Sequence, residues 1–135
     1  MELTWLQRLQ PQLLALLRIV AGLLFIEHAT VKFFAFPIAF QVPPPLPPML
    51  MAAGVIELVA GLLITVGLFT RLAAFIASGE MAIGYFMMHF TKSFWPVANQ
   101  GEAAVLFCFI FLYLAAAGAG AWSIDGARLK NAPVR

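Results

Sequence analysis

The sequence predicts an all-α integral membrane protein: a four-helix bundle whose loops are short except for a proline-rich outer loop between spans one and two. Of the 135 residues, 63% are hydrophobic and 10% are charged, whereas a soluble domain carries about 25% charged residues. Four apolar stretches each come close to the roughly 20 residues that a helix needs to cross a bilayer. Helices are expected because a segment in lipid must satisfy its own backbone hydrogen bonds.

The chain divides by composition into three parts. Residues 1–12 carry apolar side chains on one helical face and polar ones, including Glu2, on the other, which is typical of a helix lying in the membrane interface. Residues 13–126 hold the apolar stretches, and residues 127–135 form a basic tail that we expect in the cytoplasm. The predicted spans cover residues 13–36, 49–69, 72–90 and 101–122.

The first span begins after Pro11, which a helix tolerates at its start because the first N–H groups have no intrahelical partner. Its apolar run resembles a signal peptide. However, Glu27, His28 and Lys32 follow where a small-residue cleavage site would stand, so we expect the segment to be retained. Six prolines favour a stiff, extended loop after it: Pro37, Pro43, Pro44, Pro45, Pro47 and Pro48.

Basic residues predict the orientation, because Lys and Arg gather on the cytoplasmic side of membrane proteins. Four spans put both termini on one side, and that side holds most of the basic residues: Arg8, Arg71, Arg128, Lys130 and Arg135, with Arg18 just inside it. The other side has Lys32 and Lys92. We therefore expect both termini in the cytoplasm. The basic residues form no contiguous face, which argues against nucleic-acid binding.

Ionisable residues inside the spans are the best indicators of function, because a charge near the bilayer middle costs roughly 2.5–3.5 kcal/mol on insertion scales. They are Arg18, Glu27, His28, Glu57 and Glu80. Glu57 lies about 12 Å below the outer end of its span, and Glu27 and His28 lie at a similar depth. We expect Glu57, His28 and Glu80 to handle protons. Glu27 points away from the Arg18 stripe, which leaves an oligomer contact and a protonated carboxyl as alternatives.

Small residues share the helical faces that carry Glu57 and Glu80, which predicts that these faces pack against other helices. Arg18 is the expected partner of Glu57 or Glu80 in a structural ion pair. Lys32 or His28 is expected to reach Glu57 from the outer side. The alternative is that such a pair only fixes the register of the helices, without any chemistry.

A further group of polar residues is expected to bind a ligand near the outer ends of the spans: His28, Lys32, His89, Glu102 and Tyr85. The alternative is that their polar tips only reach toward water. The two histidines stand on different spans without an i, i+4 partner, so no metal site is predicted. The single cysteine, Cys108, excludes an intrachain disulfide and fits a small buried apolar side chain.

Several motifs occur together in this sequence. Span one has arginine, glycine, phenylalanine, histidine and lysine at helical spacing: Arg18, Gly22, Phe25, His28 and Lys32. Span two has an acidic start and a Gly-x-x-Thr-Arg ending: Glu57, Gly61, Gly67, Thr70 and Arg71. Later motifs are Glu80-Met81-Ala82, His89, Phe94, Pro96, Asn99, Gly101-Glu102 and Gly118-x-Gly120-x-x-Ser123-x-Asp125. Together they resemble the DoxX family of small four-span bacterial membrane proteins over about residues 13–126.

The resemblance implies a redox role in the bacterial plasma membrane, because the family is named from a subunit linked to thiosulfate oxidation with quinone as acceptor. Other relatives are associated with oxidative-stress complexes. The chain would be at most a membrane subunit of an oxidoreductase. His28 or His89 would hydrogen-bond a bound quinone, and Glu57 would handle a proton. No flavin, haem or thiol motif is present, so a soluble oxidoreductase subunit would supply electrons.

Two other functions fit the sequence. The first is a non-catalytic membrane scaffold for a soluble oxidoreductase, which would tolerate substitution of Glu57 and His28. The second is a small proton-coupled transporter that works as a homo-oligomer, since four spans enclose too little volume for a roomy path. Flux through such a transporter would depend on Glu80.

Overall fold

The computed structural model describes residues 3–133 as helices and connecting loops, so that Glu2 and Arg135 lie outside the described residues. The long helices are α2 Gln10–Phe34, α3 Pro48–Val66, α4 Thr70–Gly84 and α6 Glu102–Ala117. A π-helical turn, η1 Tyr85–His89, continues α4. The short helices are α1 Thr4–Arg8, α5 Pro96–Asn99 and α7 Ile124–Lys130.

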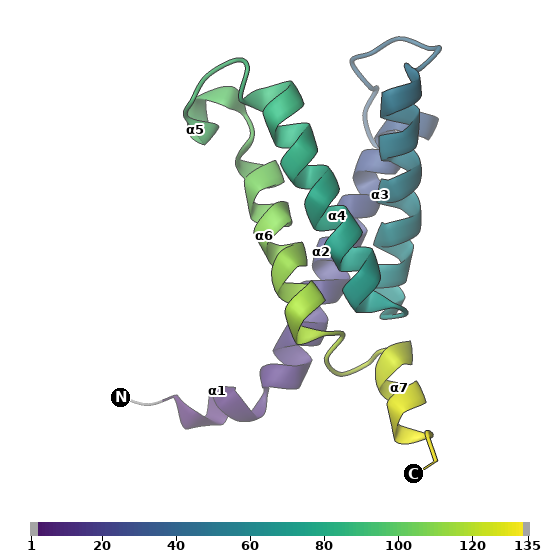
Figure 1. The fold of residues 1–135 in the computed structure, drawn as a ribbon, viewed down its shortest axis with the longest axis vertical. Helices are drawn as coiled ribbons and strands as arrows, with labels where there is room; N and C mark the ends of the chain where they lie inside the picture. Colours follow the sequence, from purple (N-terminus) through teal and green to yellow (C-terminus); the bar gives the residue numbers. More distant parts are fainter. Residues whose placement is uncertain (1–2, 134–135) are drawn as a thin grey trace.

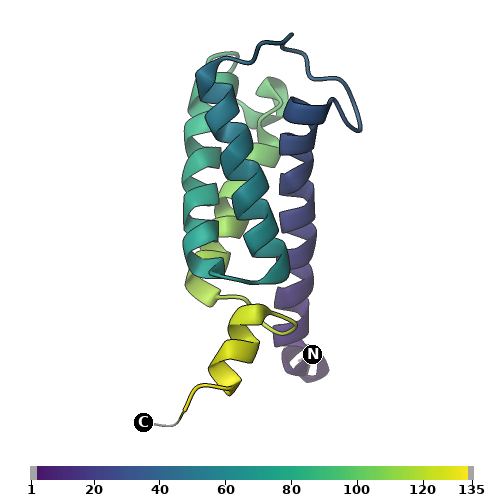
Figure 2. The ribbon, with the colours of Figure 1, turned by 90° about the vertical axis from the view of Figure 1, so that its right-hand side faces the viewer.

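The four long helices run alternately in opposite directions (Figure 1). α2 packs along α3, α4 packs along α6, and α3 also packs against α4, whereas α2 and α6 make few contacts. Both termini and α7 lie at one end of the bundle, which we call the terminal end (Figure 1 and Figure 2). The proline-rich loop and α5 lie at the opposite end, which we call the loop end.

Within residues 3–133, three helical segments are long and apolar enough to cross a membrane: Gln10–Phe34, Pro48–Val66 and Thr70–His89. α6 is apolar but has only 16 residues. At 1.5 Å per residue it rises roughly 24 Å, less than the hydrocarbon core of about 30 Å. The predicted length of the fourth span is therefore wrong. α6 ends at Ala117 because Gly118 and Gly120 have φ angles of 88° and 71°, which favour glycine and leave the helix.

Glycines allow α2 and α3 to approach closely, as the small-residue face of α3 predicts. A Cβ added at Gly22 would lie 2.4 Å from Thr65 Oγ1, and one at Gly61 would lie 2.6 Å from Ile26 Cγ1. Glu57 belongs to the same buried face of α3. The close contact of the two helices therefore turns the Glu57 side chain toward α2.

Aromatic rings fill the core between the two helix pairs. The ring of Phe25 on α2 contacts that of Phe111 on α6 edge-on, with centroids 4.8 Å apart, and Phe107 stacks on Phe111 at 5.5 Å. The outside of the bundle remains apolar: the side chains of Phe75 and Leu106 are each 63% exposed. Exposed side chains of this kind indicate that the helices contact the lipid bilayer.

Arg18 has backbone partners in place of the expected carboxylate. Its side chain is fully buried, and its guanidinium donates hydrogen bonds to five carbonyl groups, those of Ile64, Thr65, Ala119, Ala121 and Trp122. The predicted ion pair of Arg18 with Glu57 or Glu80 is therefore wrong. The last carbonyl groups of a helix lack intrahelical partners, and those at the end of α3 use the guanidinium donors. Arg18 joins α2, α3 and the segment after α6.

Candidate functional site

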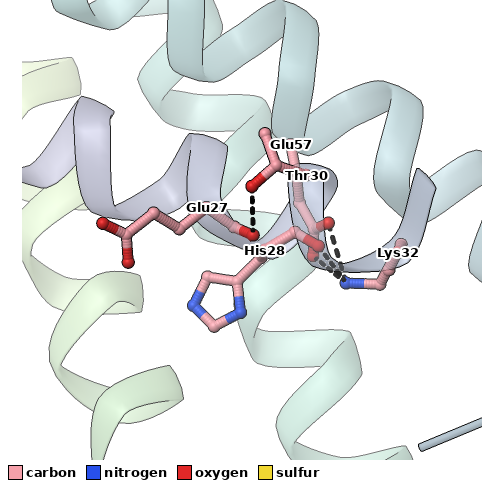
Figure 3. Close-up of polar contacts among 5 residues, drawn as sticks. All are labelled: Glu27, His28, Thr30, Lys32 and Glu57. Atoms are coloured by element: carbon pink, nitrogen blue, oxygen red, sulfur yellow. Dashed lines mark hydrogen bonds and ion pairs between the residues drawn. The ribbon is translucent and has the colours of Figure 1, made fainter. Parts of the chain in front are cut away.

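A buried ion pair joins α2 to α3 in the half of the bundle nearer the loop end. Lys32 Nζ lies 2.8 Å from both carboxylate oxygens of Glu57 (Figure 3). The two side chains are only 11% and 4% exposed. The predicted contact between Lys32 and Glu57 is confirmed, whereas the alternative partner, His28, makes no hydrogen bond to Glu57.

The surrounding segments position this pair. Lys32 stands in the last turn of α2, on the stripe that also carries Arg18. On α3, a Cβ at Gly54 would lie 2.6 Å from the ring of Phe33, so glycine makes room for this ring one turn from Glu57. Lys32 Nζ also lies 5.6 Å from the centroid of the Phe40 ring, so the proline-rich loop contributes an aromatic face to the ammonium group.

Glu80 on α4 brings a second carboxyl group to the same region. It lies within electrostatic range of both Glu57 and Lys32. One of its carboxyl oxygens, Oε2, is buried and has no hydrogen-bond partner among residues 3–133. We call Lys32, Glu57 and Glu80 the Lys32 cluster. It combines one ammonium group with two carboxyl groups on three different helices.

The side chains of His28 and Glu27 lie beside the Lys32 cluster without joining it, although Lys32 Nζ also donates to the backbone carbonyl oxygen of His28 at 3.4 Å. Figure 3 shows both side chains directed away from the Lys32–Glu57 pair. The His28 ring packs edge-on against Phe107 of α6, with centroids 5.8 Å apart. Both residues are exposed on the surface of the chain. Glu27 therefore points away from the polar interior, as the helical spacing predicts.

A separate polar network lies at the loop end, between η1 and the segment around α5. His89 Nδ1 lies 3.0 Å from the carbonyl oxygen of Asn99. The amide nitrogen of Asn99 donates to Tyr85 Oη at 3.1 Å and to the carbonyl oxygen of Ser93 at 2.9 Å, while Gly101 N donates to Asn99 Oδ1 at 2.8 Å. Because a carbonyl oxygen can only accept, the proton of this contact is on Nδ1, and His89 Nε2 is left for other partners.

The residues expected to bind a ligand together near the outer ends of the spans therefore lie in separate places. His28 and Lys32 belong to α2, whereas His89 and Tyr85 belong to the network around Asn99. No hydrogen bond or ion pair between the two places occurs in the described part of the chain. Glu102 is exposed at the first position of α6 and belongs to neither place.

Asn99 is a residue whose role sequence reasoning missed. Its side chain is 1% exposed and connects the turn before α6 to η1. In the sequence, Asn99 is one of the residues that resemble the DoxX family, but its position between a proline and a glycine is a pattern that many loops share and does not indicate its partners. The π-helical turn that presents Tyr85 and His89 was also not predicted, although such turns occur frequently at functional sites.

Two charged residues at the terminal end have structural roles. Asp125 accepts hydrogen bonds of 2.9 Å from the N–H groups of Phe69 and Thr70, at the start of α4. Partial burial alone would raise the pKa of Asp125, but the hydrogen bonds from Thr70 and Phe69 and the nearby Arg128 outweigh it and hold the pKa below its usual value. Arg71 donates to the last carbonyl groups of α6, those of Ala115, Ala116 and Ala117.

Comparisons with known proteins agree with this architecture. The sequence model of the DoxX family matches residues 13–90. An uncharacterized protein of Haemophilus influenzae is 46% identical over 130 residues, which cover 93% of this chain and 97% of that relative. No solved structure matches the chain. The chain therefore belongs to the DoxX family and is a multi-pass membrane protein.

Proposed function

We propose that this protein is an integral membrane component of a quinone-linked redox or oxidative-stress system, and that the Lys32 cluster handles a proton for it. The observation that supports the proposal is the arrangement of charges in the cluster. Both oxygens of Glu57 contact Lys32 Nζ, whereas Glu80 Oε2 is buried without a partner among the described residues.

Charge balance explains why a proton belongs in this cluster. One ammonium group can neutralise one of the two carboxylates, and an uncompensated charge is costly in a medium of low dielectric constant. A proton on a carboxyl group or a bound cation would neutralise the charge of the second carboxylate, and a hydrogen-bond donor from a ligand would stabilise that charge. We favour the proton, because its transfer through Glu80 leaves the Lys32–Glu57 pair intact.

The two histidines suit different oxidation states of a quinone. With Nδ1 of His89 donating to the Asn99 carbonyl, the neutral ring offers Nε2 as an acceptor, which fits the hydroxyl group of a quinol. Nε2 of His89 can donate to a quinone carbonyl only when the ring carries a second proton. His28, whose ring has no hydrogen bond within residues 3–133, can donate to a quinone carbonyl in its neutral form. Electrons would come from a soluble oxidoreductase subunit.

The proposed orientation is that of a four-span protein with both termini in the cytoplasm of a bacterium. Basic residues at the terminal end support it, because cytoplasmic ends collect Lys and Arg. They are Arg8 of α1, Arg71 at the start of α4, and Arg128 and Lys130 of α7. In this orientation Lys32 and His28 lie in the outer half of the membrane, while Glu57 and Glu80 lie near the middle of their helical segments.

A binding experiment on the purified protein tests the redox role. We expect the wild type in detergent to bind a short-chain ubiquinone analogue with an affinity that changes with pH. Glu80→Gln should remove most of that change, because glutamine cannot exchange the proton, and His28→Ala should weaken binding at every pH. Glu27→Gln is the matched control, since its carboxyl group points away from the cluster. Binding no stronger than to empty micelles, or identical pH profiles for the Glu80 and Glu27 variants, would contradict the proposal.

A further inference from the structure

We propose that a pocket at the terminal end binds the phosphate headgroup of an anionic phospholipid. The pocket has a volume of about 600 Å³ and lies between the start of α4, the end of α6 and α7. We call it the arginine pocket, because Arg71 and Arg128 both line it. The other lining residues used below are Phe69, Leu72, Gly118, Asp125 and Leu129.

Arg71 is held in place from one side. Its guanidinium donates to the carbonyl groups that end α6, and it lies against Gly118, where an added Cβ would come within 3.1 Å of Nη2. These carbonyl groups use part of the five N–H donors of the guanidinium and fix its plane. The side chain remains exposed, so the other donors are accessible to a ligand. A planar guanidinium held in this way suits the bidentate binding of a phosphate.

Arg128 supplies the second positive charge. Its guanidinium lies 5.5 Å from the centroid of the Phe69 ring and forms no ion pair with a carboxylate of the described residues. Among residues 3–133, Asp125 is the one carboxylate that lines the pocket, and both of its oxygens already accept backbone hydrogen bonds. Two guanidinium groups therefore outnumber one carboxylate, and the pocket has a net positive charge that complements a phosphate.

The apolar surface next to the pocket argues for a lipid as the occupant. Leu72 and Leu129, at the rim, are 64% and 78% exposed. From Leu72 the exposed face of α4 continues through Phe75 and Ile76 toward the bilayer. An acyl chain can lie along this face while its phosphate stays at the level of the arginines. Basic pockets between membrane helices bind anionic headgroups by the same combination of contacts.

Lipid retention by the purified protein tests the assignment. The protein in detergent is mixed with phosphatidylglycerol or phosphatidylcholine, and the bound lipid is counted by native mass spectrometry. We expect the wild type to retain phosphatidylglycerol preferentially. Arg128→Gln should lower that retention about fivefold, as the loss of one guanidinium near a headgroup predicts. Lys130→Gln removes the same charge from the same helix but outside the pocket lining, and should lower retention much less.

Competition with inorganic phosphate distinguishes a phospholipid from a free anion as the occupant of the arginine pocket. A lipid site should keep phosphatidylglycerol when excess phosphate is added, since phosphate lacks the apolar contacts. Complete displacement would assign the pocket to a free anion instead of a lipid. Equal retention of the two lipids, or equal losses in the Arg128 and Lys130 variants, would overturn the proposal.

Discussion

At the scale of single residues, the Lys32–Glu57 pair is the place where burial most strongly affects the energy of two charges. Nearly all of both side chains is removed from solvent. Such a pair gains from its hydrogen bonds but loses the hydration of two charges, so its net contribution to stability is small. Removing one partner is different, because the other charge is left buried alone.

The substitution Lys32→Met should therefore reduce the free energy of unfolding by about 3–5 kcal/mol, because Glu57 would remain buried without its cation. Chemical denaturation of the purified protein in detergent measures this loss. Lys92→Met removes an exposed lysine at the loop end and should change the free energy of unfolding very little. Adding Glu57→Leu to Lys32→Met should restore most of the stability. Full stability of Lys32→Met alone would show that the pair is not buried as described.

How far a residue's partner could be predicted depended on the kind of partner. Lys32 and Glu57 are charged side chains on faces set by helical spacing, so their contact could be inferred. The partners of Arg18 are carbonyl oxygens that become available only where α3 ends and where the chain turns after α6. Every residue has a backbone carbonyl group, so the residue types do not indicate which of these groups will accept a hydrogen bond from Arg18. For the same reason the hydrogen bonds of Asn99 could not be predicted.

At the scale of elements, helix ends are closed by side chains from distant parts of the sequence. Arg71 of α4 covers the carbonyl groups of α6, and Asp125 of α7 covers the N–H groups at the start of α4. The existence of the long helices could be read from apolar composition alone. The early end of α6 and the π-helical turn after α4 could not, because they depend on backbone angles and tertiary contacts.

Because Asp125 must be ionised to accept the hydrogen bonds at the start of α4 at full strength, its contribution to stability depends on pH. Since folding lowers the pKa of Asp125, its contribution is present above the unfolded pKa near 3.8 and is lost as the pH falls through the lower, folded value. Asp125→Asn should lower the free energy of unfolding by about 1 kcal/mol at neutral pH. The difference between the two proteins should shrink below about pH 4. Denaturation curves over this range measure it, and a difference that grows with acid would contradict the assignment.

At the scale of the whole molecule, the short fourth helix determines whether the chain crosses the membrane an even number of times. In the described part of the chain, three segments are long enough to span the bilayer, and α6 is shorter by a few residues. A bilayer can thin locally around a short helix at modest cost. The even number of spans that the sequence predicts therefore requires α6 to cross with some mismatch. If it did not cross, α7 would be separated from α1 by the membrane.

Single cysteines in a Cys108→Ala background distinguish these arrangements by labelling with a membrane-impermeant maleimide. The exposed positions are Gln7 in α1, Thr91 at the loop end and Asn131 after α7. With four crossings and cytoplasmic termini, intact cells should label Thr91→Cys, whereas Gln7→Cys and Asn131→Cys should react only after permeabilisation. Labelling of Gln7→Cys and Asn131→Cys but not Thr91→Cys in intact cells would show that the orientation is the opposite of the proposed one. Labelling of Asn131→Cys but not Gln7→Cys would show that α6 does not span, since an odd number of crossings separates the two ends of the chain.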